Sequence, residues 1–198
     1  MTILKLSRNI QINMRNHKYL FVITLVFFAL GFVNIHFSLL GIICMILPIL
    51  LVLKNRRKTW CQGYCPRASL YSASGKSKKW TSRKTPQFFT KGSMKWIMLA
   101  YFGLSLFFII MSTVGVFRGF RPPMNYLRFL ILIPIPYEIP QLINFIEFTP
   151  WLLHLSYRFY SMMITTTLIG LTMAVIYKPR TWCTICPIAT VSDVILKK

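Results

Sequence analysis

The sequence predicts an all-α integral membrane protein with four transmembrane helices and an interfacial or re-entrant segment between the third and the fourth. Two observations support this fold class. Of the 198 residues, 55% are hydrophobic and the mean hydropathy is +0.56, values that a soluble domain rarely reaches. Several apolar runs also approach the roughly 20 residues that cross a bilayer, and the charges are concentrated between these runs. We therefore expect a single membrane domain over residues 1–198.

Residues 19–53 form a first apolar run that is too long for one straight span. As a single helix it would measure about 52 Å at 1.5 Å per residue, whereas the hydrocarbon core is about 30 Å thick. Asn34 and His36 lie near its middle, and we interpret the run as a tight hairpin of two short spans. With two later apolar runs, the predicted spans are 19–34, 37–53, 96–116 and 157–177.

The two long connections differ in composition. Residues 54–95 are polar and hold 12 basic residues and no acidic ones, with a serine- and glycine-rich centre that predicts a flexible loop. Within residues 118–156, the apolar stretch 127–153 contains four prolines and two glutamates, which disfavour a plain spanning helix. An interfacial or re-entrant segment packed against protein is expected there. A short surface helix is expected at 188–198.

The formal charge of +21 comes from 24 Lys and Arg against 3 Asp and Glu. No recognised nucleic-acid-binding motif accompanies this charge, so we do not expect nucleic-acid binding. The positive-inside rule explains it better, and contact with membrane lipids follows. Both termini and residues 54–95 together hold 20 of the 24 basic residues. This side is predicted to be cytoplasmic, with both termini on the cytoplasmic face of the inner (plasma) membrane and residues 118–156 as the outer loop.

One short pattern occurs twice, each time just after an apolar run. The first copy reads Thr59-Trp60-Cys61-Gln62-Gly63-Tyr64-Cys65-Pro66, and the second reads Thr181-Trp182-Cys183-Thr184-Ile185-Cys186-Pro187. Two predicted spans separate the copies, so both are expected on the same face of the membrane. The sequence therefore predicts that four thiolates hold one metal centre, namely Cys61, Cys65, Cys183 and Cys186.

The Cys-Pro step indicates what kind of centre this is. A bacterial ferredoxin ligand run also ends in Cys-Pro, and proline suits the first position of a helix. Cys65 and Cys186 are thus predicted at helix N-termini, where the helix dipole favours a thiolate. Trp60 and Trp182 are expected to shield the centre or to anchor at the headgroup level. An iron–sulfur cluster, most simply 4Fe-4S, is the expected cofactor, while structural zinc and a redox dithiol are the alternatives.

Three further residues have side chains that could belong to a site. Cys44 lies within the second predicted span and is interpreted as a small buried hydrophobe. His36 and His154 are expected on the outer side as hydrogen-bonded interfacial histidines, with a haem or quinone role as the alternative. The two glutamates of the outer loop are expected to pair with arginines there, or to relay protons for a quinone.

The two cysteine segments, residues 59–66 and 178–187, resemble the membrane iron–sulfur proteins of the NapH and NosR type. The resemblance implies an electron-transfer component, not a complete enzyme, that relays electrons between a quinol or cytoplasmic donor and an extracytoplasmic redox partner. The second motif departs from the family's Cys-x3-Cys-Pro pattern because it has two intervening residues. The ferredoxin segment that many members carry is also missing from this sequence, so further redox centres would come from partners.

Two rival functions are compatible with paired cysteines. A membrane thiol–disulfide oxidoreductase also uses four spans, but it normally has its cysteines on the oxidising side, and these are predicted on the other. A zinc-stapled scaffold subunit would need the same four thiolates without any redox role.

Overall fold

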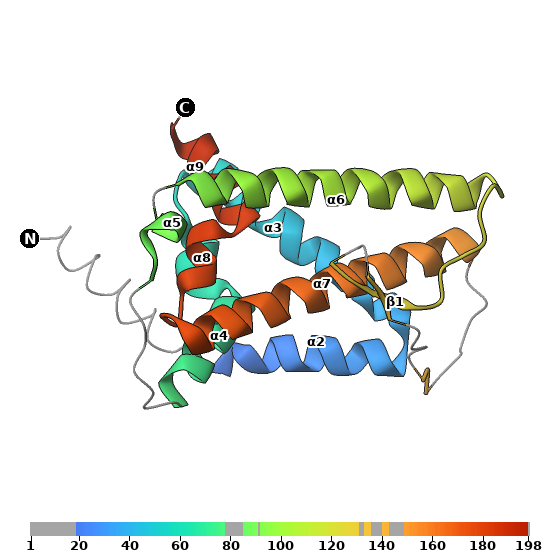
Figure 1. Cartoon of the computed structure of the whole chain (residues 1–198), viewed down its shortest axis with the longest axis horizontal. Coiled ribbons are helices and arrows are strands. Elements are labelled where there is room, and N and C mark those ends of the chain that lie inside the picture. The colour runs from blue at the N-terminus through green and yellow to red at the C-terminus, as the bar shows by residue number, and fades with distance from the viewer. Residues whose placement is uncertain are drawn as a thin grey trace, which may run out of the picture.

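The chain is described from a computed structural model, which covers residues 19–77, 85–90, 92–130, 133–135, 140–142 and 149–197. The expectations for the basic amino-terminal segment and for Glu138 and Glu147 lie outside these ranges. The described residues are mostly helical, and the helices run between two ends of an elongated bundle (Figure 1).

The predicted helical hairpin is present near the amino terminus. It comprises α2 (Phe21–Val33), the 3₁₀ turn η2 (Ile35–Leu39) and α3 (Leu40–Asn55). Asn34 interrupts the helices with an extended backbone (φ −153°, ψ 128°), and its side-chain oxygen accepts a hydrogen bond of 2.9 Å from the backbone N–H of His36. The α2 helix has only 13 residues, about 20 Å at 1.5 Å per residue, so it is shorter than the first predicted span.

Three helical segments in the described part of the chain are long and apolar enough to cross a membrane. They are Ile35–Asn55, α6 (Ser93–Phe117) and α7 (Pro150–Ile176). The α6 helix begins three residues before the third predicted span and ends one residue after it. These helices are compatible with a membrane protein, as the sequence predicted.

The start of α7 corrects the sequence prediction, which placed it near residue 157. The helix begins at Pro150, where a proline fits because the first helical N–H has no intrahelical partner. The polar first turns continue the helix because their side chains are buried against protein: His154 is 4% exposed and Ser156 is fully buried. Hydropathy alone places the boundary too late when polar residues face other helices.

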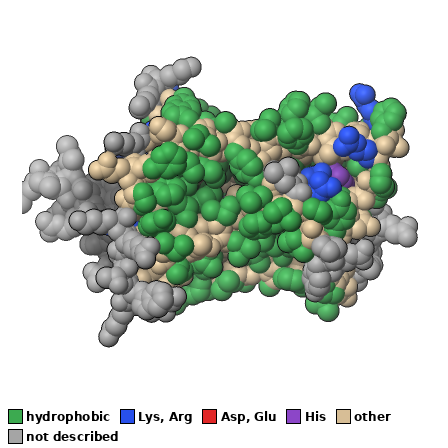
Figure 2. Space-filling view, in the orientation of Figure 1, with side chains coloured by type: hydrophobic (Ala, Val, Ile, Leu, Met, Phe, Trp, Pro, Cys, Tyr) green, Lys and Arg blue, Asp and Glu red, His purple; other side chains and the backbone are tan. Residues whose placement is uncertain are grey.

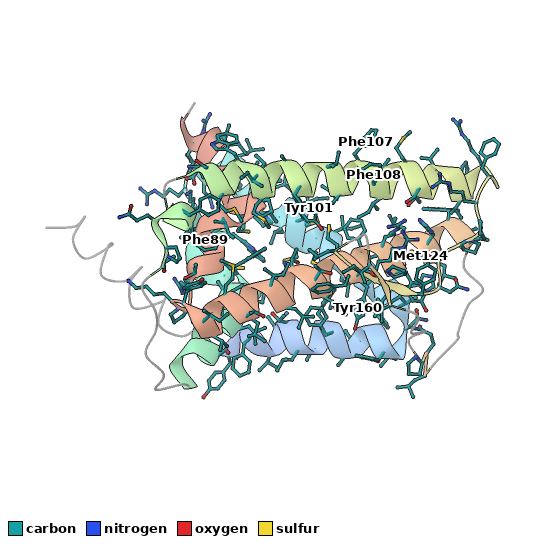
Figure 3. All side chains as sticks on the ribbon, in the orientation of Figure 1. Phe89, Tyr101, Phe107, Phe108, Met124 and Tyr160 are labelled. Carbon is teal, nitrogen blue, oxygen red and sulfur yellow. The ribbon has the colours of Figure 1, made fainter. Side chains whose placement is uncertain are left out.

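The α7 helix is the axis of the bundle. It has thirteen buried residues along its length, whereas α2, α3 and α6 each have four or fewer. Tyr160 points from α7 towards α2 (Figure 3), where its hydroxyl donates a 2.9 Å hydrogen bond to the Phe28 carbonyl. On the outside of α6, Phe107 and Phe108 point away from the bundle. Hydrophobic side chains cover much of the visible face (Figure 2), which is typical of helices that face lipid.

The outer connection contains a short β-hairpin that the sequence did not predict. Strands β1 (Leu127–Phe129) and β2 (Ile133–Ile135) pair antiparallel. The turn after β1 lies against the middle of the bundle: the Leu130 N–H donates to Thr165 Oγ1 of α7 at 3.4 Å, and the Tyr101 hydroxyl of α6 donates to the Leu130 carbonyl at 3.1 Å. Before α7 begins, the described part of this connection contains no spanning helix. It contacts the bundle through β1 and Leu130, whereas β2 is exposed.

The opposite end of the bundle holds the short elements that follow α3 and α7. They are the wide turn η3 (Trp60–Tyr64), α4 (Pro66–Ser77), α5 (Gln87–Thr90), α8 (Thr181–Ile185) and α9 (Pro187–Lys197) (Figure 1). The flexible loop predicted at the serine- and glycine-rich segment is wrong, because this segment is helical in α4. The carboxyl-terminal helix expected at 188–198 is present as α9.

Small residues explain why α4 is ordered. A Cβ on Gly75 would lie 2.6 Å from Cγ of Pro179, so the glycine lets α4 approach the turn after α7. On the other helix, a Cβ on Gly170 would lie 2.4 Å from the hydroxyl of Tyr71. Close packing, not local propensity, keeps this segment helical.

Candidate metal centre

The first cysteine motif folds as a turn followed by a helix start. Trp60–Tyr64 form one wide turn that ends at Cys65, whose backbone is extended (φ −72°, ψ 112°). This is the conformation that a following proline imposes, since the proline ring disfavours helical backbone before it. Pro66 then begins α4. The Cys65 carbonyl accepts a 3.2 Å hydrogen bond from the Ser69 N–H, so the first turn of α4 is anchored on the cysteine.

The second motif repeats this arrangement. The short helix α8 ends at Cys186, which is again extended (φ −59°, ψ 127°), and Pro187 begins α9. The Cys186 carbonyl accepts hydrogen bonds from the Thr190 N–H at 3.0 Å and the Thr190 hydroxyl at 3.1 Å. The prediction that Cys65 and Cys186 lie at helix N-termini is confirmed.

The structure brings the four predicted ligands to one cavity of about 70 Å³, although the two motifs are about 120 residues apart. The walls of this cavity are mainly apolar, and Trp60 and Trp182 both belong to them. Trp182 is 3% exposed, which fits a shielding role better than an anchor at the headgroups. The predicted ligands that line the cavity are Cys61, Cys65, Cys183 and Cys186, all of them free thiols.

Contacts between α4 and α7 hold the first motif in place. The guanidinium of Arg67, two residues after Cys65, reaches α7 through one nitrogen, Nη2. This nitrogen lies 2.8 Å from the Met163 carbonyl, 3.2 Å from the Met163 sulfur and 2.9 Å from Thr166 Oγ1. Hydrogen bonds from a charged donor are the stronger ones. Arg67 therefore ties the start of α4 to the central helix beside the cavity.

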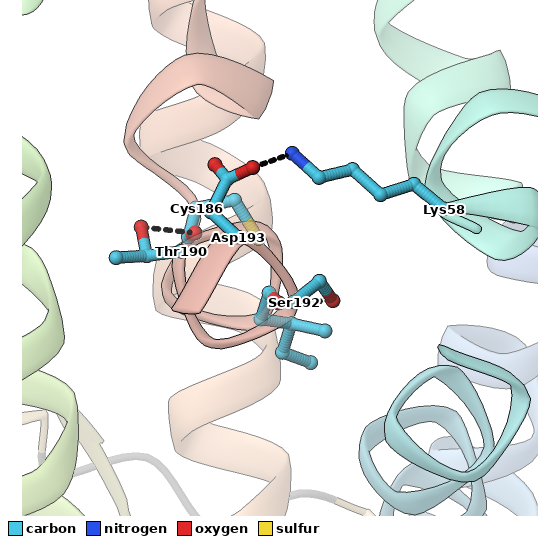
Figure 4. A network of polar contacts seen from close by, with 6 residues as sticks. Lys58, Cys186, Thr190, Ser192 and Asp193 are labelled. Atoms are coloured by element: carbon cyan, nitrogen blue, oxygen red, sulfur yellow. Dashed lines mark hydrogen bonds and ion pairs between the residues drawn. The ribbon is translucent and has the colours of Figure 1, made fainter. Parts of the chain in front are cut away.

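Two further polar contacts connect the motifs directly. Lys58, just before the first motif, forms an ion pair with Asp193 on α9 (Figure 4). Arg180, just before the second motif, donates from Nε to the Ser72 hydroxyl of α4 at 3.2 Å. The basic residue before each motif thus contacts the helix after the other motif: Lys58 contacts α9, and Arg180 contacts α4. Asp193 is the only acidic residue within the described ranges, and it takes part in this link.

Burial sets the protonation state of the free thiols. Burial, with a smaller contribution from the neighbouring cysteines, raises the pKa of Cys61 to about 11 and that of Cys183 to about 12. Burial also raises the pKa of Cys186, while the backbone N–H groups of Ile188 and Ala189 act in the opposite direction. At neutral pH these three thiols are protonated without a metal. A bound metal would supply the positive charge that stabilises the thiolates.

The residues present fit an iron–sulfur cluster. The cavity has four cysteines, apolar walls and two helix N-termini, and Lys58, Arg67 and Arg180 each lower the pKa of a lining cysteine through their charge. In a 4Fe-4S cluster the four thiolates bind four different irons and surround an inorganic core. Around zinc, four thiolates converge on one ion at about 2.3 Å. Within the described ranges, no three Cys, His, Asp or Glu side chains are arranged to hold a single metal ion.

Comparison with known proteins identifies the type of centre. The chain matches the family model of a 4Fe-4S binding domain over residues 37–85 and 159–198. Each matched stretch contains a helix of the bundle and the cysteine motif that follows it. No curated protein and no solved structure matches the chain. The match confirms the prediction of an iron–sulfur cluster as the cofactor.

Two residues of the cavity were not predicted as site residues. Cys44 on α3 lies in its wall beside the four motif cysteines, and Arg67 lines it from α4. The Cys-Pro-Arg sequence was a possible signal for Arg67, because it places a cation two residues after a predicted ligand. Cys44 gave no such signal, because no spacing connects it with either motif.

The two histidines are accounted for by local hydrogen bonds. The Nδ1 atom of His154 accepts a 3.2 Å hydrogen bond from the Met124 N–H, and its Nε2 atom lies 3.1 Å from the Ser112 hydroxyl oxygen. His36 contacts the Asn34 side chain at 2.8 Å. Both lie at the end of the bundle opposite the cysteines, which supports a structural role.

Proposed function

We propose that this chain is a membrane electron-transfer subunit that holds one 4Fe-4S cluster through Cys61, Cys65, Cys183 and Cys186. The observation that carries the proposal is the meeting of two distant, similar motifs at one cavity, with the matched 4Fe-4S binding domain covering both. When bound, the cluster would accept and donate single electrons. The protein would supply the thiolates, exclude water with Trp60 and Trp182, and balance negative charge with nearby cations.

The membrane arrangement that we propose has four helices across the bilayer, all within a single domain. Three long apolar helices support it, and α2 would be the fourth although it is short. Hydrophobic mismatch of this size is accommodated by local thinning or by packing against neighbours. The cysteine end carries the basic connection of residues 54–95, so the positive-inside rule favours the cytoplasmic face for the cluster and for both termini.

A quinol is the donor that the cavities favour over a cytoplasmic one. A second cavity, of about 340 Å³, lies between α2, α3 and α4 and shares Cys44, Trp60, Arg67 and Met163 with the cysteine cavity. Its lining is largely apolar, with Thr24 and Arg67 as hydrogen-bonding groups. An apolar pocket with a few polar groups is typical of a small-molecule site. A quinone head group there would lie next to the cluster, and a redox partner protein on the outer side would complete the relay, as in the NapH and NosR type.

The experiment that tests this function is an anaerobic purification with iron and acid-labile sulfide assays. We expect a brown protein with about four irons and four sulfides per chain. Replacing any one of the four ligand cysteines by Ser should bleach the protein, whereas Cys44→Ser is the matched control and should keep its colour. Stoichiometric zinc without sulfide would overturn the proposal in favour of a scaffold. A cluster-free protein whose cysteines cycle between thiol and disulfide would favour an oxidoreductase.

A further inference from the structure

A group of arginines lies at the end of the bundle opposite the cysteines. Arg121 follows α6, Arg128 lies on β1 and Arg158 on α7. Both Arg121 and Arg128 are close enough to Arg158 to interact with it electrostatically. Figure 2 shows basic side chains beside a histidine at this end of a largely hydrophobic surface. Like charges repel one another, so an anion bound among these arginines would relieve the repulsion.

Arg128 and Arg158 have few partners among the described residues. Arg128 donates from Nη2 to the Tyr126 hydroxyl at 2.7 Å, and its guanidinium carbon lies 5.3 Å from the centre of the Tyr126 ring. The Nε atoms of Arg128 and Arg158 are buried and have no hydrogen-bond partner there. No carboxylate contacts either residue within those ranges. Burying a charge without a partner is costly, because the charge loses its hydration.

The chain's own acids cannot neutralise this end. Residues 118–158 contain four arginines, namely 118, 121, 128 and 158, but only Glu138 and Glu147 as acids. If both glutamates paired with arginines, two positive charges would still be left. A bound anion would therefore still be attracted to this end in the fully paired case.

We propose that Arg128 and Arg158 bind the phosphate group of an anionic phospholipid. Guanidinium groups match the oxygens of a phosphate with two parallel hydrogen bonds, and both arginine side chains are only partly buried. The location fits a headgroup, because Phe117 and Trp151 meet edge to face at the adjacent ends of α6 and α7, with their ring centroids 6.3 Å apart. Aromatic residues such as Trp gather at membrane interfaces.

The neighbouring surface favours a lipid over free phosphate. Phe117 is 71% exposed and Phe120 is 79% exposed, and both lie where α6 ends. These side chains offer apolar contact to acyl chains next to the arginines. This site lies at the end opposite the cluster, so it goes beyond the proposed electron-transfer function and shares with it only the placement in a membrane.

The test uses the full chain, purified anaerobically in detergent and titrated with phosphatidylglycerol, with phosphatidylcholine of the same acyl chains, or with inorganic phosphate. The readouts are the thermal unfolding midpoint and the lipids retained in native mass spectrometry. We expect phosphatidylglycerol alone to raise the midpoint. In Arg128→Gln and Arg158→Gln, half-saturation should need at least about tenfold more of it, the change that loss of one 1.4 kcal/mol contact produces.

Arg118→Gln is the matched control, because it removes the same charge from the same end but lies outside the interacting group, and its titration should be unchanged. Arg158→Lys should show an intermediate loss, which separates loss of the fork-shaped donor from loss of folding. Equal stabilisation by phosphatidylcholine or by phosphate, or an equal loss in Arg118→Gln, would overturn the proposal. Lipid binding that appears only after the substitutions Glu138→Gln and Glu147→Gln would also overturn the proposal. Iron content is measured in every sample, so failure here and failure of the cluster proposal remain distinguishable.

Discussion

Gly170 allows the central helix α7 to lie against α4, and the Gly170→Ala variant should disturb the cluster without touching a ligand. The added Cβ would lie 2.4 Å from the Tyr71 hydroxyl oxygen and 2.5 Å from the adjacent ring carbon, whereas ordinary contacts begin near 3.4 Å. Tyr71 is 1% exposed and lines the cavity of the four cysteines. Relief of the clash therefore moves its ring into that cavity or moves α4 away from α7 by roughly 1 Å, and either shift disturbs the site.

The loss of stability in Gly170→Ala can be estimated by comparison with a control variant on another helix. A Cβ on Gly103 of α6 would have no neighbouring atom within 4 Å, so Gly103→Ala gains only the helix propensity of alanine, about 0.5–1 kcal/mol. Gly170→Ala gains the same propensity but adds an overpacking cost of about 1–3 kcal/mol. The difference between the two variants should then be about 1–3 kcal/mol, or about five- to 140-fold in the folding equilibrium.

The assay compares thermal or denaturant unfolding and iron content in the wild type, Gly170→Ala and Gly103→Ala. Gly170→Ala should unfold more readily than Gly103→Ala and retain less iron per chain. Adding Tyr71→Leu should relieve the clash, so the double variant should be no less stable than Tyr71→Leu alone. If Gly170→Ala matched Gly103→Ala, or added its full cost in the Tyr71→Leu background, the close approach of α4 and α7 would not be what positions the first motif.

Three other predictions concern the remaining contacts. Arg67→Gln should destabilise the protein by about 1.5–3 kcal/mol, because α7 loses the hydrogen bonds from a charged donor. Unfolding and iron content measure this loss. Unchanged stability and iron content would show that Arg67 does not hold α4 against α7. Gly31→Ala should weaken the docking of α2, since its Cβ would lie 2.2 Å from the Tyr160 ring, and it should lower stability while iron content stays near wild type. In the cluster-free protein, alkylation of Cys61 and Cys183 should be slow at pH 8 and accelerate up to about pH 11 and pH 12, their folded pKa values. These folded pKa values lie above the ordinary thiol pKa. The protonated thiols therefore stabilise the cluster-free fold below about pH 9, and this stability is lost as the pH rises to 11–12. Rapid alkylation at pH 8 would contradict the burial of the two cysteines.

Several features of the fold and the centre were predictable because they depend on local chemistry. Asn34 ends one apolar helix with a side chain that bonds to the backbone two residues on, a local hydrogen bond that is typical of asparagine. Proline after Cys65 and Cys186 forces an extended residue and then starts a helix. The doubled motif therefore indicated four candidate ligands and placed two of them at helix N-termini. Iron–sulfur chemistry followed from the same residues, and the matched family model confirms the cofactor.

Other features depended on residues far apart in the chain, and only the tertiary structure decided them. The segment around Gly75 has loop-like composition but is helical because Pro179 packs against it. The α7 helix starts at Pro150 because its polar first turns are buried against neighbouring elements. Low hydropathy therefore does not indicate the end of the helix there. Cys44 joins the cavity across helix contacts that no sequence spacing encodes. Local sequence fixes backbone conformation and ligand type through short-range sterics and hydrogen bonds, whereas the approach of helices depends on the shapes of side chains that meet only after folding.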